Sequence, residues 1–573
     1  MVSFKKRLIC HLIHCKGYFL FLIWLSVCLQ AEQFDTLTNP KGHLLFLIQH
    51  GQHQQAIKIY QKYFQETKQH DFEILHRIGL GILDHGFRQK DPESQLLALF
   101  GASVSAHEDA FYIIEGSLKN RQPQIQLIAV GALARFQDDI ADQALIRALG
   151  SKQLLIQYEA VRMLCKMKHP KAESLAESLM YKLPTEFWPA FPDLFAISDK
   201  QNSTNILLKL LNHSSNEIRL ASIISVGEHH RDDLIVLIRK LMVNNHFAQQ
   251  EACAKALGEL KDESSIPQLK VLTTSQYSHV ALTAAFALYQ MGIKDAKETI
   301  ENYALKKDLF AIALLGKIEG SSELLVSLAS NSDSEIQIRL NCLVSLLQQN
   351  HPKALDMVDE FLIRDQRDLA FNSQLSSGRA LKIWKVTSSA GELLKEDLSA
   401  YLENLQFKEY LIQKVREISE DKLIQLAHVI FNRQQNELVP IVSKNLEELN
   451  SKNALTCLIE HHQQLGAPFV RMYCNLSLYR LQEEGPYRKN IQDWVKKQSQ
   501  TDFIRFQSFN PWKIGQESFS LTPEETSKIL IEACETLAQN QDLEGIETLT
   551  EVIATGHSKN KYALAGLLVR AAQ

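Results

Sequence analysis

Apolar residues recur along this chain of 573 residues at spacings of three and four, the pattern of amphipathic helices. A longer period of 31 residues lies on top of that spacing. Steps of 31 in both directions from Cys253 meet a small residue at nearly every stop, with a single step of 27 before Ala311. The stops are Ala98, Ala129, Ala160, Phe191, Ser222, Cys253, Ala284, Ala311 and Cys342. A fixed period of this length indicates repeated helical hairpins.

Two further series support this register. Four residues after each small position, the chain is always apolar: Ala102, Leu133, Leu164, Phe195, Val226, Leu257, Leu288, Leu315 and Leu346. Sixteen residues after it, on the expected second helix, stand Ile114, Leu145, Ala176, Leu207, Ile238, Leu269, Ile300, Ser327 and Val358. Only Ser327 is polar, and it follows the shortened step. We therefore expect regular repeats over residues 94–365.

The repeat resembles a known family. Residues 250–262 read Gln-Glu-Ala-Cys-Ala-Lys-Ala-Leu-Gly-Glu-Leu-Lys-Asp, which is similar to the bacterial HEAT repeat named after phycobilisome lyases. The resemblance implies an all-α fold, an α-solenoid in which antiparallel helix hairpins stack into a superhelix, as in HEAT and armadillo proteins. The small residue lets two helices approach, and Leu fills the seam. Asp138 and Asp262 follow the first helix and are expected to cap the next one.

The regions outside the regular repeats keep helical spacing but lose the period. Residues 51–60 resemble one tetratricopeptide helix, and residues 470–481 again fit the HEAT pattern. Thr522-Pro523-Glu524-Glu525 is a typical helix start. The expected segments are an N-terminal helical cap over 32–93, irregular helical repeats over 366–502, a linker over 503–521 and a C-terminal helical cap over 522–573.

One repeat departs from the pattern. Residues 183–192 contain three prolines, which remove helix hydrogen bonds, so we expect a broken or shortened first helix there. Phe187, Trp188 and Phe191 are candidate contacts for a protein partner, and Trp512 in the linker is another. The alternative is that these aromatic residues fill a locally rearranged core and tuck the linker onto the solenoid.

The N-terminus predicts export. A basic start at residues 5–7 precedes an apolar stretch over residues 18–29, and Ala31 offers a small residue for cleavage before Glu32. This order is typical of a secretory signal peptide, here residues 1–31, and the apolar stretch is short for a membrane span. An uncleaved anchor is the alternative.

Cys28 offers a second way to attach the chain to a membrane. Leu25-Ser26-Val27-Cys28 resembles a bacterial lipoprotein box, which would put a lipid on Cys28, although Val27 stands where such boxes have Gly, Ala or Ser. The alternative is a cysteine inside a hydrophobic signal. Export together with a bacterial repeat type predicts the periplasm or cell envelope of a bacterium.

Charge argues against nucleic acid as a partner. The chain has 62 basic and 66 acidic residues, a formal net charge of −4, and no long basic run. Proteins that bind nucleic acid usually concentrate basic residues on one face. We therefore expect protein partners.

The residue types that could carry chemistry are scattered. No C-x-x-C occurs, and the six cysteines beyond the N-terminal segment are expected to be buried core thiols, with a disulfide or zinc site as the alternative. The pairs His229-His230 and His461-His462 are adjacent, and neighbouring residues on a helix point about 100° apart. Arg219, Arg339 and Arg471 are expected to pair with neighbouring acids.

Known catalytic signatures are missing from the sequence. His107-Glu108 lacks the second histidine of a zinc-protease helix, and no GxSxG elbow or phosphate-binding glycine loop occurs. Deoxyhypusine hydroxylase, a HEAT-built metal enzyme, uses several His-Glu pairs, whereas this chain has one. We expect no catalytic residue, metal or cofactor.

These observations favour an exported scaffold that binds a protein. The first alternative is an enzyme of the bilin lyase or isomerase type, which would bind a tetrapyrrole. The second is an assembly factor held at the membrane by lipid on Cys28 or by an uncleaved N-terminus.

Overall fold

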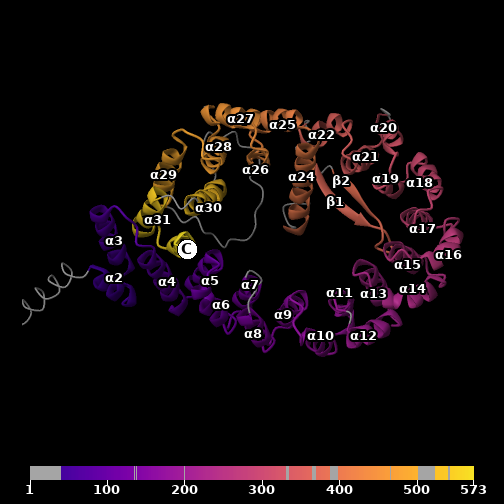
Figure 1. Cartoon of the computed structure of the whole chain (residues 1–573), viewed down its shortest axis with the longest axis horizontal. Coiled ribbons are helices and arrows are strands. Elements are labelled where there is room, and N and C mark those ends of the chain that lie inside the picture. Colours follow the sequence, from indigo (N-terminus) through magenta and orange to yellow (C-terminus); the bar gives the residue numbers. More distant parts are fainter. Residues whose placement is uncertain are drawn as a thin grey trace, which may run out of the picture. The chain divides into compact units, whose positions relative to one another are not determined.

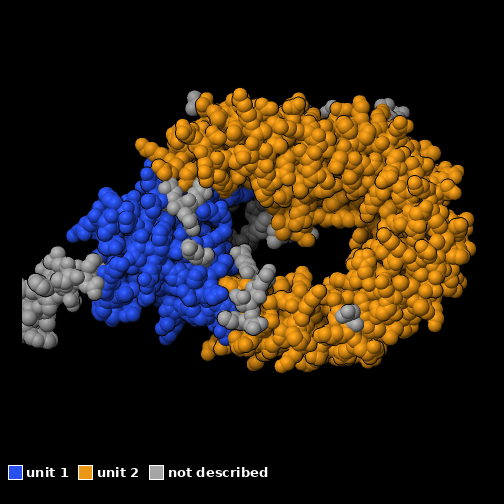
Figure 2. Space-filling view, viewed as in Figure 1, with its two compact units in different colours: residues 1–117, 492–505, 526–573 blue, residues 118–491, 506–525 orange. Residues whose placement is uncertain are grey.

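The chain is an α-solenoid that divides into two compact units (Figure 2). Unit 1 comprises residues 1–117, 492–505 and 526–573, and unit 2 comprises residues 118–491 and 506–525. The computed structural model describes residues 40–133, 136, 139–198, 200–330, 334–363, 369–387, 398–464, 466–500, 523–539 and 543–572. The predicted signal peptide, Cys28, Asp138 and the linker with Trp512 lie outside these residues.

Helices of unit 2 form two layers along a curved row (Figure 1). Consecutive helices of the inner layer pack directly on one another. The inner helices are α7 (Pro123–Leu133), α9 (Leu154–Lys166), α11 (Pro192–Ala196), α13 (Asn216–Glu228), α15 (Phe247–Glu259), α17 (Ser278–Gln290), α19 (Leu309–Leu315), α21 (Ile336–Gln348), α24 (Leu398–Ile418), α26 (Val439–Leu449) and α28 (Pro468–Arg480). Each of them also packs on a helix of the outer layer.

The outer layer completes each hairpin. Its helices are α8 (Asp139–Ala148), α10 (Ala172–Met180), α12 (Gln201–Leu211), α14 (Ile235–Met242), α16 (Ile266–Leu272), α18 (Ala296–Leu305), α20 (Ser322–Ser330), α22 (Ala354–Leu362), α25 (Glu420–Asn432) and α27 (Lys452–Gln463). The boundary between the two units falls within α29 (Tyr487–Gln498). Short 3-10 turns occur at Thr185–Ala190, Asp232–Leu234 and Glu263–Ser265.

The three predicted series lie in the core. Every position of the small-residue series is fully buried, from Ala98 to Cys342, and so are nearly all positions of the other two. Ser327 is exposed, and the fully buried Leu325 lies two residues before it on the same helix. Backbones approach closely along the inner layer: a Cβ on Gly258 would lie 2.9 Å from Cα of Ala287. The small side chains thus set the spacing of the inner helices.

One predicted cap is absent. Asp262 precedes the 3-10 turn but its carboxylate makes no capping hydrogen bond. It pairs instead with Arg239 on α14, at 3.0 Å, and is largely buried. A buried carboxylate is stabilised more by a full positive charge than by one backbone N–H, so the ion pair takes its place.

The all-helical prediction for residues 366–502 is wrong at its start. Strands β1 (Ala370–Leu375) and β2 (Lys382–Thr387) form an antiparallel hairpin, in a register that pairs Ala370 with Thr387 and Leu375 with Lys382. Residues 383–387 are rich in β-branched and aromatic residues and come shortly after a Ser-Ser-Gly sequence, which is a hairpin signal.

Unit 1 contains helices from both ends of the chain. They are α2 (Pro40–Gln49), α3 (His53–Thr67), α4 (Phe72–Arg88), α5 (Pro92–Ser105), a 3-10 turn (Glu108–Ala110), α6 (Phe111–Ser117), most of α30 (Pro523–Gln539), α31 (Leu543–Thr555) and α32 (Lys561–Ala571). Helix α32 packs on α4 and α5. The approach is so close that a Cβ on Gly566 would collide with the carbonyl oxygen of Gly101. The two expected caps therefore share one packed unit.

The cysteines of the described residues lie in the core, as predicted. All six cysteines of the described residues are unpaired and buried. Burial raises the pKa of Cys165, Cys342, Cys457 and Cys534 to about 12. Among the described helices, none has the length and apolar character that crossing a bilayer requires.

Candidate functional site

The β-hairpin lies against the inner layer of unit 2, on side chains of α21. Asn341 accepts from the backbone N–H of Trp384 at 3.0 Å and donates to its carbonyl at 2.8 Å. Gln337 accepts from the N–H of Val386 at 3.0 Å and donates to its carbonyl at 2.8 Å. Four residues of helix rise about 6 Å, and two strand residues span about 6.6 Å, so the two side-chain amides match alternate residues of the strand. We call this the amide ladder.

The turn of the hairpin reaches α15, more than a hundred residues earlier in the chain. The N–H of Gly378 donates to Oε2 of Glu251 at 2.9 Å, and Ser377 donates to the same oxygen at 3.4 Å. Glu251 is fully buried, and burial raises the pKa of its carboxyl, opposed by these hydrogen bonds. Gly378 is needed here because a Cβ would lie 2.6 Å from the carbonyl oxygen of Ala248.

The base of the hairpin is held by α24. The N–H of Phe371 donates to Oδ1 of Asn404 at 3.0 Å, and the N–H of Ser373 donates to Glu403 at 3.1 Å. The ring of Phe371 packs on Phe407, with centroids 4.9 Å apart. The hairpin is therefore fixed at three places on one face of the solenoid.

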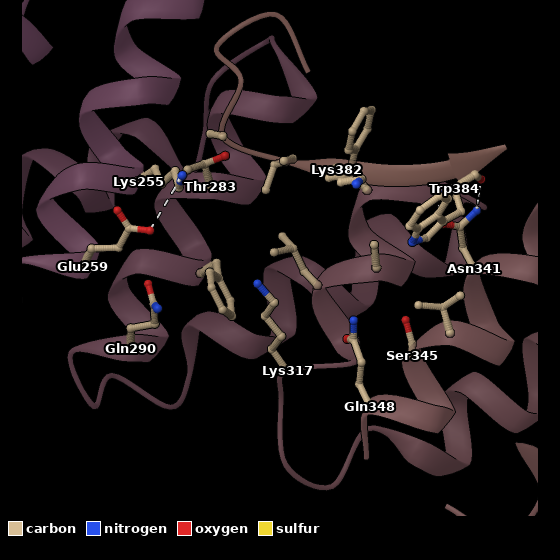
Figure 3. A pocket seen from close by; sticks show the side chains of 17 residues that line it. Lys255, Glu259, Thr283, Gln290, Lys317, Asn341, Ser345, Gln348, Lys382 and Trp384 are labelled. Carbon is tan, nitrogen blue, oxygen red and sulfur yellow. Dashed lines mark hydrogen bonds and ion pairs between the residues drawn. The ribbon is translucent and has the colours of Figure 1, made fainter. Parts of the chain in front are cut away.

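A cavity of about 380 Å³ lies between the hairpin and helices α15, α17, α19 and α21 (Figure 3). Its charged lining residues are Lys255, Lys317, Lys382 and Glu259. Lys382 lies over the ring of Trp384, with Nζ 4.5 Å from the centroid, and Lys317 lies 5.8 Å from the centroid of Phe286. The cavity is thus basic and partly aromatic.

Two oxygens at this cavity lack a hydrogen bond within the described residues. Oγ1 of Thr283 is buried without a partner, and so is Oε2 of Glu259. Burial raises the pKa of the Glu259 carboxyl, although Lys255 opposes the shift. Buried polar groups are normally satisfied, so these oxygens leave hydrogen-bonding capacity for a bound group.

The proline-rich repeat has a shortened helix, as predicted. Residues 185–190 form a 3-10 turn, and α11 covers five residues. Phe187 is 59% exposed, so it stays a candidate contact. Trp188 is half-buried, and its Nε1 donates to the carbonyl of Leu183 at 3.2 Å. Phe191, also a candidate contact, is fully buried and packs edge-on against Tyr158, so it fills a locally rearranged core, which was the alternative.

Arg219 and Arg339 occupy the same position of their repeats but have different partners. Arg339 pairs with Glu360, as predicted. Arg219 instead donates to Gln249 at 3.0 Å and to the carbonyls of His213 and Ser214. Its partners are neutral because the guanidinium reaches the turn before its own helix.

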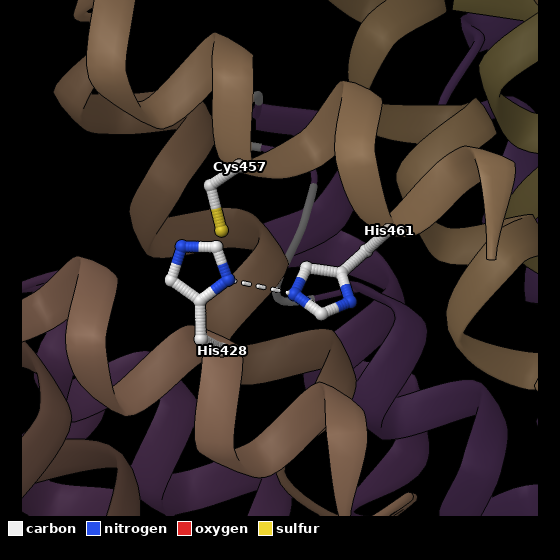
Figure 4. A group of neighbouring side chains, drawn as sticks. All are labelled: His428, Cys457 and His461. Carbon is white, nitrogen blue, oxygen red and sulfur yellow. Dashed lines mark hydrogen bonds between the residues drawn. The ribbon is translucent and has the colours of Figure 1, made fainter.

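Three side chains from two neighbouring outer helices come together in unit 2. His428 on α25 and Cys457 and His461 on α27 place one nitrogen or sulfur each within 4.8 Å of one another (Figure 4). Nδ1 of His428 and Nε2 of His461 are 2.9 Å apart. The sequence feature that indicates this cluster is the spacing of Cys457 and His461, which are four residues apart and therefore share a helix face. We call these residues the His–Cys cluster.

A second group lies in unit 1. Nε2 of His76 is 2.9 Å from Oδ2 of Asp109, and Nδ1 of His107 is 3.8 Å from the same oxygen. Nδ1 of His107 also accepts from the N–H of Asp109, so it caps the 3-10 turn. Asp109 is exposed. These hydrogen bonds explain why the three side chains lie together: they form a surface contact between α4 and the 3-10 turn.

The comparisons with known proteins concern the repeat. The family of HEAT repeats matches residues 204–289. No curated protein sequence matches the chain. The complex of CpcE and CpcF of phycocyanin lyase from Nostoc is similar at 17% identity over 51% of this chain and 96% of that one, with a TM-score of 0.18.

Two further solved structures are similar. Kap121p, a karyopherin, bound to Nup53p matches at 12% identity over 90% of this chain and 73% of that one, with a TM-score of 0.29. Human deoxyhypusine hydroxylase matches at 14% identity over 47% and 93%, with a TM-score of 0.18. The family match falls on helices α12 to α17, where the 31-residue register is regular. This chain is an α-solenoid that carries HEAT repeats at residues 204–289.

Proposed function

We propose that this chain is an exported scaffold that binds a protein partner along the inner layer of unit 2. It acts in the periplasm or envelope of a bacterium and catalyses no reaction. The partner contributes an extended, acidic segment that enters the cavity between the hairpin and helices α17, α19 and α21.

The observation that carries this proposal is the amide ladder. Asn341 and Gln337 bind both the N–H and the carbonyl of an extended strand, and all four of these hydrogen bonds go to the main chain of that strand. Recognition of this kind depends on extended main chain and not on sequence. An inner helix of this solenoid therefore already holds one extended polypeptide, its own hairpin.

Charge specifies the class of partner. The cavity beside the hairpin presents Lys255, Lys317 and Lys382 against Glu259. Lys255 is already paired with Glu228, at 2.9 Å. Lys317 and Lys382 lie over aromatic rings, which leaves their ammonium groups available to a carboxylate. An acidic segment with an apolar side chain for Phe286 and Trp384 fits this lining.

The test compares charge reversals at the cavity and away from it. The full chain is crosslinked in the native envelope, and the attached peptides are mapped. We expect crosslinks on α17, α19, α21 and the hairpin. The double variant K317E/K382E should lose the partner, whereas K270E, on the outer helix α16, should keep it. Binding should weaken as salt rises, because the attraction is electrostatic.

Two results would overturn the proposal. One is equal recovery of the partner by K317E/K382E and wild type. The other is crosslinks confined to the outer layer. A purified chain that changes the absorbance of an added tetrapyrrole would instead favour the lyase alternative.

Export has its own test. Mass spectrometry of the mature protein should find a chain that begins at Glu32. A lipid on Cys28 or a retained residue 1 would support the membrane-attached assembly factor instead.

A further inference from the structure

We propose that the His–Cys cluster, His428, Cys457 and His461, is a zinc site that joins helices α25 and α27. It is independent of the cavity and of the proposed scaffold function.

The backbone brings the three donors together. Cys457 and His461 are four residues apart on α27 and therefore share a face of that helix. His428 comes from α25, which packs on α27 as the outer helix of the preceding repeat. Zinc holds nitrogen at about 2.0 Å and sulfur at about 2.3 Å, so two nitrogen ligands of a tetrahedral ion lie about 3.3 Å apart. The two ring nitrogens are 2.9 Å apart, so small side-chain rotations suffice to admit the ion.

The neighbouring residues orient His461 for metal binding. Its Nδ1 donates to Oε1 of Gln464 at 2.8 Å, since an amide oxygen can only accept. The amide is fixed in this orientation because its Nε2 donates to Oδ1 of Asn432, at 3.2 Å. Nε2 of His461 is thereby left with a lone pair that points at His428 and Cys457. Histidines that bind zinc typically donate their other N–H in this way.

The protonation states balance on binding. Without an ion, Nδ1 of His428 donates to Nε2 of His461, so one proton lies between the two rings. When zinc binds both nitrogens, that proton moves to Nε2 of His428. Cys457 binds as a thiolate and releases one proton to solvent, since a coordinated thiol is deprotonated. Zinc therefore enters with the release of one proton per chain.

A hollow beside the cluster provides entry and a fourth ligand. It is lined by His428, Asn432, Glu460, His461, Gln463 and Gln464. Glu460 is exposed, while Cys457 lies on the buried side of the cluster. The fourth position therefore faces solvent, where water or the Glu460 carboxylate can complete the tetrahedron.

The donor set selects the ion. Two imidazoles and one thiolate suit zinc, whereas calcium and magnesium need oxygen ligands. The group of His76, His107 and Asp109 in unit 1 has no sulfur. A thiolate signal therefore distinguishes the proposed site from that group.

The experiment uses the full chain without a histidine tag, stripped of metal by a chelator. Cobalt replaces zinc as a coloured probe. We expect one tightly bound cobalt per chain, with a thiolate-to-cobalt charge-transfer band and the d–d bands of a tetrahedral ion, and zinc should displace it. Zinc should also raise the midpoint of thermal unfolding, because it binds only the folded chain.

Matched variants assign the signal. C457S should abolish the charge-transfer band, whereas C534S, which removes a buried thiol in unit 1, should keep it. H461Q is the second variant if C457S fails to fold. Q464L should keep the band but weaken zinc binding at least tenfold, because it removes the hydrogen bond that orients His461.

Two outcomes would overturn the site. One is a folded wild type that binds cobalt without a charge-transfer band. The other is equal zinc affinity for wild type, C457S and H461Q.

Discussion

His53 is a buried histidine whose surroundings favour the neutral ring. It is the first residue of α3, its side chain is buried, and neither ring nitrogen has a hydrogen-bond partner. Burial lowers its pKa to about 4, helped by the nearby charges of His85 and Lys561 and opposed by Asp84. The positive end of the helix dipole acts in the same direction as the burial.

This gives an acid sensitivity with a definite sign. Between pH 6.5 and 4, the unfolded chain binds a proton at His53 and the folded chain does not, so stability falls as pH falls. The loss reaches about 3 kcal/mol at pH 4. H53L should remove this part of the slope of unfolding free energy against pH, whereas H50Q, at an exposed histidine, should not. An H53L protein that keeps the full slope would contradict the assignment.

At the scale of elements, the inner helices stack at backbone distance. A Cβ on Gly258 of α15 would lie 2.8 Å from Cβ of Ala287 and 2.9 Å from its Cα, on α17. Gly227 stands in the same relation to Ala256, and Gly316 to Ser345. Each glycine meets the helix of the next repeat, so its missing side chain sets the distance between repeats.

The pair G258A and G131A tests this packing. Alanine favours an isolated helix over glycine by about 1 kcal/mol, so G131A, where a Cβ meets nothing within 4 Å, should not lower the midpoint of unfolding. G258A must move a backbone, and overpacking costs about 1–3 kcal/mol. We expect its midpoint to fall below wild type in urea. A rise with both variants would show that the inner helices have room to spare.

The elements that could be predicted are those set by the repeat. The register from Ala98 to Cys342 identified the buried positions because the residue at this position packs between neighbouring helices in every repeat. The hairpin has weaker signs in the sequence: β-branched and aromatic residues at 383–387, and Gly378 in the turn. A strand of six residues between helical segments gives too short a pattern to be predicted from the sequence, because its stability depends on hydrogen-bond partners elsewhere in the chain.

The candidate sites are harder to predict from the sequence, because each is formed by residues that lie far apart along the chain. Nothing in the sequence around Asn341 indicates that its amide binds the backbone of Trp384. Likewise, nothing around Glu251 indicates that its carboxylate binds Gly378. Cys457 and His461 are visible as a pair four apart, but His428 joins them only through the stacking of α25 on α27. The spacing of residues along one helix predicts which of them share a face. A site also needs residues from the helix packed against that face, and the spacing does not predict which helix that is.

At the scale of the whole molecule, unit 1 is made from both ends of the chain. Helix α32 packs on α4 and α5, with Gly566 against Gly101 and Val569 close to Gly79. His70 is 2.8 Å from the carbonyl oxygen of Leu543, which ties the start of α4 to α31. The N-terminal helices therefore lack part of their core until the last helices have been synthesised.

Deleting residues 561–573 should consequently unfold the N-terminal helices. Leu564, Leu568 and Val569 are fully buried, and burying such side chains contributes about 1.5–3 kcal/mol each, a large share of the stability of a typical domain. Hydrogen exchange measured by mass spectrometry should show lost protection in α4 and α5. Helices α13 to α17 serve as the internal control, because their cores are built within unit 2 and should keep their protection. If α4 and α5 stayed protected in the shortened chain, the prediction would be wrong. The N-terminal helices would then have a sufficient core without α32.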